Sequence, residues 1–160
     1  MTTEEYQNEI NNHYKEIEKL NNEMQALQHK ALKDELDKFI EGSDHKYFYN
    51  NFVSETVSVK SVAYINNVEQ LEDGRYIITA IFYDYYDYTI PDLLHEYTFV
   101  QKQIKLPADQ FISNFKAENY LNPTQFVSYK MQCELNLITQ TPIMTFDEFI
   151  NGVEVKKDEE

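Results

Sequence analysis

The sequence predicts an α+β fold with a long N-terminal helix and an antiparallel β-sheet of about four strands, with one or two short helices on one face. Three observations predict it. A heptad pattern of apolar residues runs from Tyr6 to Ala31, a period of two follows after Gly42, and no strand–helix–strand repeat typical of a parallel sheet occurs. The chain has 160 residues, which is enough for one hydrophobic core.

Residues 1–42 are expected to form one helix. Thr2 and Glu5 have the spacing of a capping box at its start, and Gly42 is a typical residue just beyond a helix C-terminus. One face carries a stripe of residues spaced alternately four and three apart. Its members are Tyr6, Ile10, His13, Ile17, Leu20, Met24, Leu27 and Ala31. This spacing is typical of a coiled-coil seam.

Two roles of this helix remain open: it can pack along its own sheet, or its seam can pair with a copy of itself. After Ala31 the apolar face changes register and continues through Leu32 and Leu36. A helix of about 39 residues would be roughly 58 Å long, which is more than a small sheet covers. We therefore expect a homodimer. Its predicted interface residues are Ile10, Ile17, Leu20, Met24 and Leu27.

Three strands are expected within an antiparallel domain that spans residues 43–153. Residues 57–65 place apolar side chains on one face of a strand, and residues 76–83 carry them on both faces. The Asp-Gly pair at 73–74 is typical of a hairpin turn, so these two strands should be antiparallel neighbours. Residues 94–106 are expected to add a third strand to the same sheet.

The C-terminal part of this domain is expected to add two short helices and a fourth strand. One helix should begin at Pro107, and the other at Thr145, which has the spacing of a capping box with Glu148. Between them, residues 127–137 alternate strictly between apolar and polar, the pattern of a half-buried strand. Residues 154–160 are predicted to be a disordered acidic tail.

The composition argues against several classes of partner. The formal net charge is −14 and the pI is near 4.6, so phosphate backbones and anionic lipid surfaces should repel the chain. No run approaches the roughly 18 apolar residues of a membrane span. The lone cysteine, Cys133, and an N-terminus without signal-peptide features favour a cytoplasmic location. We expect direct binding neither to nucleic acid nor to a membrane.

The sequence lacks the patterns of common catalytic and cofactor sites. The three glycines all occupy predicted turns or helix ends, which leaves none for a phosphate-binding loop. Cys133 is flanked by apolar neighbours, where cysteine behaves as a small hydrophobic residue. The four histidines are scattered without the spacing of a zinc site. We therefore expect no catalytic residue, no cofactor and no metal.

One pattern resembles a metal-dependent nuclease: Asp92 is followed by Gln103 and Lys105. These residues would lie along one strand, however, and eleven residues of straight strand span roughly 36 Å. They cannot share a metal ion. A local site is geometrically easier, because a hairpin end brings its two strands together, but acidic hairpin ends are usually only solvated. That site would use Asp84, Asp87, Asp92, His95 and Glu96.

The stretch from Tyr83 to Glu96 is the strongest candidate for a binding surface, because it is rich in tyrosine and acid and contains neither Lys nor Arg. The predicted partner-binding residues are Tyr83, Asp84, Tyr85, Tyr86, Asp87, Tyr88, Asp92 and Glu96. Tyrosine offers rigid contact area, and carboxylates complement Arg and Lys. We expect a hairpin end that binds a basic surface of another protein. The alternative is that the tyrosines pack at the edge of the core and the acids only keep the hairpin soluble.

These observations favour a non-enzymatic, acidic protein-binding module that forms a homodimer. A narrower hypothesis is a phage or mobile-element inhibitor that imitates nucleic acid and occupies a basic, nucleic-acid-binding surface of a host enzyme. It follows from the acidic strand residues, whose carboxylates could stand in for phosphates. The composition, rich in Asn, Lys, Ile and Tyr, is typical of AT-rich genomes such as those of many phages and low-GC bacteria. Two alternatives remain open. One is a coiled-coil scaffold or assembly protein, and the other is a small-molecule-binding domain or enzyme with a pocket between sheet and helix.

Overall fold

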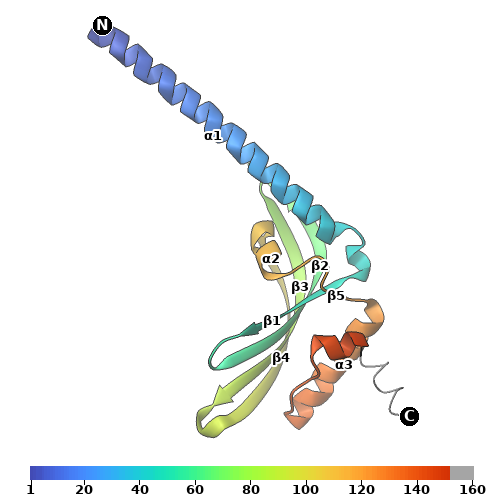
Figure 1. Cartoon of the computed structure of the whole chain (residues 1–160). Coiled ribbons are helices and arrows are strands. Elements are labelled where there is room, and N and C mark those ends of the chain that lie inside the picture. Colours follow the sequence, from blue (N-terminus) through green and yellow to red (C-terminus); the bar gives the residue numbers. More distant parts are fainter. Residues whose placement is uncertain (152–160) are drawn as a thin grey trace.

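The computed structural model describes residues 1–151, so the tail expected at 154–160 lies outside the described residues. A long helix, α1 (Thr3–Ile40), extends away from a five-stranded antiparallel sheet and the shorter helices packed on it (Figure 1). The α+β class predicted from the sequence is confirmed. Over the described residues, no helix is both long and apolar enough to cross a membrane.

The strands of the sheet are arranged in the order β4-β3-β2-β1-β5, and every neighbouring pair is antiparallel. After α1 the elements are η1 (Ser43–His45), β1 (Tyr47–Val53), β2 (Val57–Gln70), β3 (Tyr76–Ile90), η2 (Pro91–Leu93), β4 (Leu94–Pro107), α2 (Ala108–Asn114), β5 (Tyr120–Leu121) and α3 (Pro123–Thr139). A further helical segment covers residues 146–151. The three strands expected in the central part of the chain are confirmed as β2, β3 and β4, whereas β1 and β5 were not predicted.

Both predicted capping boxes are present. At the start of α1 the Glu5 amide donates to the Thr2 hydroxyl at 3.2 Å, and the Thr2 amide donates to the Glu5 carboxylate at 3.3 Å. At the start of the last helical segment, the Glu148 amide donates to the Thr145 hydroxyl at 3.2 Å. These bonds satisfy amide groups that the first turn of a helix leaves without a partner.

The hairpin turn predicted between β2 and β3 brings the sheet against α1. Gly74 has a φ of +92°, and a Cβ atom at this position would lie 2.5 Å from Nδ1 of His29. Glycine is therefore required both by the backbone conformation and by the close approach of the imidazole. His29 is also the first residue of α1 that is partly buried, because the helix is exposed throughout residues 3–28. The helix thus meets the rest of the fold only over its C-terminal third.

Helices cover both faces of the sheet, not the single face that the sequence suggested. We call the face that carries Ala63 the first face and the face that carries Val62 the second face, since successive strand residues point to opposite sides. Phe39 of α1 and Phe111 of α2 pack in the core of the first face, with their rings 5.6 Å apart. Tyr129 of α3 packs in the core of the second face. The chain therefore forms two cores with the sheet between them.

One prediction is wrong: residues 127–137 belong to helix α3 and not to a strand. The start of this helix is well defined. Asn122 and Gln125 exchange both bonds of a capping box, at 2.9 and 2.8 Å, and Pro123 occupies the first turn. Proline suits that position because its φ is already helical and no amide partner is needed there.

The buried face of α3 explains why the alternating pattern of residues 127–137 predicted a strand. Phe126, Tyr129 and Cys133 follow helical spacing and are buried. Met131 and Leu135, which a strand would place beside Cys133, are exposed instead. An alternating run also contains apolar residues four positions apart, so it satisfies the period of a helix as well as that of a strand. The expected burial of Cys133 is correct, although its secondary structure was not.

Candidate binding surfaces

The first candidate surface is the apolar stripe on α1, which we call the α1 seam: Tyr6, Ile10, His13, Ile17, Leu20, Met24, Leu27 and Ala31. Along residues 3–28, roughly 39 Å of helix, every residue is exposed. The large apolar side chains of the seam keep between 46% (Ile10) and 67% (Leu27) of their surface in contact with solvent. Figure 1 shows this part of α1 projecting beyond the sheet. All five predicted interface residues therefore lie on an uncovered face.

The second candidate surface, the tyrosine- and aspartate-rich stretch from Tyr83 to Glu96, forms the end of the β3–β4 hairpin, and most of its residues lie within the paired strands. Pairing between β3 and β4 continues without interruption to Ile90 and Leu94, and η2 forms the turn. In that turn Asp92 has a φ of 71°. Tyrosine packs well on a pleated surface, which favours extension of the strand through this stretch. Successive residues of the stretch consequently point to opposite faces of the sheet.

On the first face, the carboxylate of Asp84 is buried. The Ser61 hydroxyl donates to it at 2.5 Å, and the Lys102 ammonium lies 4.0 Å away. Burial raises the pKa of Asp84, whereas the Ser61 hydrogen bond, the charge of Lys102 and a hydrogen bond from Tyr86 act in the opposite direction. The side chain is satisfied within the protein and offers little of its surface to a partner.

Beyond Asp84, the first face carries five half-buried residues and one exposed residue that belong to neither core. The rings of Tyr86 and Tyr88 stack with centroids 5.7 Å apart and planes 8° apart. Their cross-strand neighbours come from β2 and β4. We call this surface the open sheet face: Val57, Val59, Tyr86, Tyr88, Glu96 and Thr98. Val57, Val59 and Thr98 were missed from the sequence, because only the strand register places them beside the tyrosines.

On the second face, the remaining residues of the stretch are held by contacts within the protein. Tyr85 is buried, and its hydroxyl donates to the carbonyl oxygen of Thr141 at 2.7 Å. Burial raises the pKa of Tyr85 to about 12, which keeps this donor protonated. The Tyr83 ring packs against Phe126 of α3 with centroids 4.7 Å apart. Asp87 forms a 2.7 Å hydrogen bond with Nδ1 of His95.

The predicted partner-binding residues thus fall into two groups. Asp84 and Tyr85 are buried, and Tyr83 and Asp87 make contacts on the second face. Tyr86, Tyr88 and Glu96 lie on the open sheet face, and Asp92 is exposed in the turn. Asp84 and Asp87 lie on opposite faces of β3 and Asp92 lies in the turn, so the three carboxylates do not form one row of charges. No cluster of three or more metal-ligating side chains occurs among residues 1–151.

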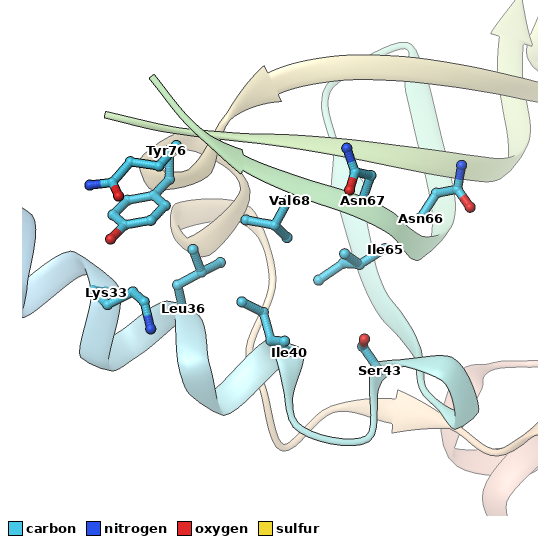
Figure 2. Close-up of a pocket in the computed structure, with 10 residues that line it drawn as sticks. Lys33, Leu36, Ile40, Ser43, Ile65, Asn66, Asn67, Val68 and Tyr76 are labelled. Carbon is cyan, nitrogen blue, oxygen red and sulfur yellow. The ribbon is translucent and has the colours of Figure 1, made fainter. Parts of the chain in front are cut away.

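A cavity of about 510 Å³ lies between α1 and the sheet (Figure 2), where one alternative hypothesis expected a binding pocket. Leu36 and Ile40 form its helical wall, and Ile65 and Val68 lie opposite them on β2. The ammonium group of Lys33 at its rim is paired with Asp37 at 2.7 Å. The titratable side chains in its lining are Lys33 and Tyr76.

The outer face of α3 carries a further set of exposed apolar side chains: Val127, Met131, Leu135 and Ile138. The first three were expected to lie in a strand, and the helix instead turns them away from the core. Helical spacing places all four along one side of α3. They form a third uncovered surface, separate from the α1 seam and the open sheet face.

Comparisons of the chain with models of protein families, with curated proteins and with solved structures find no match.

Proposed function

We propose that this protein is a non-enzymatic protein-binding module that forms a homodimer through α1. The observation that carries the proposal is the exposure of the α1 seam along all of the helix that extends past the sheet. A helix that packs against nothing is marginally stable in water, and most helical stability in proteins comes from burial of an apolar face. The seam spacing matches a coiled coil, so a second helix would bury it. A second copy of the chain supplies that helix.

We also propose that the open sheet face binds a basic surface of another protein in the cytoplasm. Two stacked, half-buried tyrosines on this face offer rigid contact area, and the neighbouring Glu96 complements Arg and Lys. The net charge of −14 would attract such a partner and speed its approach. In the narrower form of the proposal, the basic surface belongs to a nucleic-acid-binding host enzyme, which the protein inhibits. A buried, lone thiol suits the reducing cytoplasm.

A coiled-coil scaffold or assembly protein is the second candidate function, and the same exposed seam favours it. In a scaffold the helix is the functional part, and the sheet only holds it. The two candidates differ in what the open sheet face does. If the protein is a binding module, substitutions on the open sheet face should abolish partner binding. If it is a scaffold, the same substitutions should leave its assembly intact.

The dimer is tested by light scattering coupled to size-exclusion chromatography. Wild type should be a dimer, and the double variant Ile17→Asp/Leu20→Asp should be a monomer, because it would place four aspartates in the apolar seam of each dimer. The matched control is Asn8→Asp/Asn22→Asp, which makes the same change in charge on the side of α1 away from the seam. It should remain a dimer. A wild-type monomer at the highest attainable concentration would exclude the dimer.

The partner surface is tested by affinity capture from host lysate with identification by mass spectrometry. The variant Tyr88→Ala/Glu96→Gln should lose basic proteins that wild type captures, and wild type should capture less at high salt. The control Tyr120→Ala/Glu118→Gln removes one aromatic ring and one charge near β5, at the other edge of the sheet. Equal capture by wild type and both variants would remove the open sheet face from the function and favour the scaffold.

A further inference from the structure

We infer that two copies pair through the α1 seam in parallel and in register, so that both sheets lie at the same end of a two-stranded coiled coil. This inference rests on the proposed homodimer and adds the orientation of the two chains. The seam is the longest uncovered apolar surface on α1, and its last residue, Ala31, lies two residues beyond His29, which contacts the turn at Gly74. Two in-register helices would therefore run together up to the point where each enters its own sheet.

The core positions of the seam suit a two-stranded parallel pair. In heptad notation, position a is occupied by Ile10, Ile17, Met24 and Ala31, and position d by Tyr6, His13, Leu20 and Leu27. Within parallel coiled coils, β-branched residues at a combined with leucine at d favour two strands over three or four. Here the two isoleucines are both at a, and the two leucines are both at d.

His13 favours one register. A polar residue in a coiled-coil core sets the alignment of the helices, because it is best placed opposite another polar residue. In the parallel, in-register pair, His13 faces His13 of the partner subunit. A shift by one heptad would instead place it opposite the partner subunit's Leu20, and the antiparallel arrangement opposite the partner's Met24. Both alternatives bury an imidazole against an apolar side chain, which is costly when no hydrogen bond compensates.

The charges beside the seam also disfavour the antiparallel pair. Three of the four g positions are acidic, namely Glu9, Glu16 and Glu23, whereas the facing e positions Tyr14, Asn21 and Gln28 are uncharged. In a parallel pair each g residue lies beside the e residue of the next heptad on the other helix, so none of these glutamates faces another acid. In an antiparallel pair, g positions face g positions. Glu16 would then lie beside Glu23 of the partner subunit, twice per dimer, although Glu9 would meet the partner's Lys30.

The parallel arrangement has a consequence for binding. It places two open sheet faces at one end of the dimer, and each can contact the same target. Two weak contacts on a dimeric or repetitive basic surface then act together, because the second contact becomes intramolecular once the first has formed. The target class that this geometry fits is a basic surface that occurs in two or more copies.

The orientation is tested by disulfide cross-linking of the full-length protein with oxidised glutathione, followed by alkylation and non-reducing electrophoresis. Leu27→Cys should form a disulfide-linked dimer as its main product, since d positions of a parallel pair face each other within reach of a disulfide. In an antiparallel pair the two residues at position 27 would lie roughly 25 Å apart. The control Asn22→Cys, away from the seam, should stay uncrosslinked. Cys133 is fully buried and does not compete.

A second experiment distinguishes a dimer with antiparallel helices from a protein that does not dimerise. A tagged Ile10→Cys chain is mixed and refolded with an untagged Leu27→Cys chain. A cross-link between tagged and untagged chains, with no Leu27→Cys homodimer, would overturn the parallel orientation while the dimer stands. Absence of every cross-link, together with a wild-type monomer in light scattering, would overturn the dimer itself. A cross-link within each variant and none between them is the result expected here.

Discussion

Ser61 on β2 donates a hydrogen bond of 2.5 Å to Asp84 on β3, and both residues are buried. Burial nevertheless raises the pKa of the Asp84 carboxyl, because removal from water penalises its charged form. The folded protein therefore retains this proton at a higher pH than the unfolded chain does. The contribution of the protonated Asp84 to the free energy of unfolding is fully present below the ordinary pKa of aspartate. It decreases as the pH rises through the raised pKa of the folded protein.

We predict that Asp84→Asn becomes more stable relative to wild type as the pH rises from about 3 to about 7. Asparagine retains an oxygen that accepts from Ser61, and it carries no charge that burial would penalise. The measurement is urea unfolding of both proteins across this range, with the difference in free energy of unfolding plotted against pH. Because all other carboxylates are common to both proteins, the difference reports Asp84. A difference that changes in the opposite direction would contradict the assignment.

Gln140 holds the edge strand of the sheet. Its side-chain oxygen accepts from the Tyr97 amide at 2.9 Å, and its side-chain nitrogen donates to the Tyr97 carbonyl at 3.1 Å. Gln140→Ala should destabilise the protein by about 1–3 kcal/mol, because both main-chain groups lose their partner. Hydrogen exchange should accelerate at the Tyr97 amide in particular.

A second variant separates these hydrogen bonds from backbone strain at the same position. Gln140 has a φ of 55°, a conformation that favours glycine. Gln140→Gly should therefore be about 1 kcal/mol more stable than Gln140→Ala, while both show the same faster exchange at Tyr97. Equal exchange in wild type and both variants would mean that the hydrogen bonds do not hold β4.

Gly74→Ala should destabilise the protein for two reasons, an unfavourable positive φ and a collision with the His29 imidazole. The conformational part should cost at least about 1 kcal/mol, and the collision adds to it. The double variant Gly74→Ala/His29→Ala should recover the part that is due to collision and not the part that is due to φ. Urea unfolding of the single and double variants checks this as a mutant cycle. A cycle without coupling would mean that α1 and the turn do not touch.

Cys133 should react with thiol reagents far more slowly in the folded protein than after unfolding. The side chain is fully buried, and burial raises the pKa of its thiol to about 12, so very little reactive thiolate exists at neutral pH. Labelling with Ellman's reagent, with and without denaturant, measures the ratio of the two rates. Rapid labelling of the folded protein would contradict the packing of α3 against the second face.

Much of the fold could be predicted because its determinants are close together in the chain. The Thr2–Glu5 capping box and the heptads of α1 act within one or two helical turns. The turn at Gly74 likewise joins β2 and β3 through local conformation. Strand β1 was missed because Asn50 and Asn51 interrupt it, and its pairing with residues 58–63 of β2 supplies the missing preference.

The candidate surfaces show the same division between local and distant determinants. The α1 seam could be recognised from spacing alone. The tyrosine- and aspartate-rich stretch could be recognised from composition, but the roles of its members could not, because residues on adjacent positions of β3 face different layers of the protein. Asp84 forms a hydrogen bond with Ser61 on the first face, whereas Asp87 forms one with His95 on the second face.

Sequence patterns were sufficient for the α+β class, the exposed helical seam and the three central strands. The tertiary structure alone decided that residues 127–137 are helical, that helices cover both faces of the sheet, and which tyrosines remain accessible. The physical reason is that an alternating run fits both helical and strand periods locally. The choice then depends on what each face can bury, and the partners of Tyr129, which are the carbonyl oxygens of Lys60 and Tyr83, lie far away in the chain.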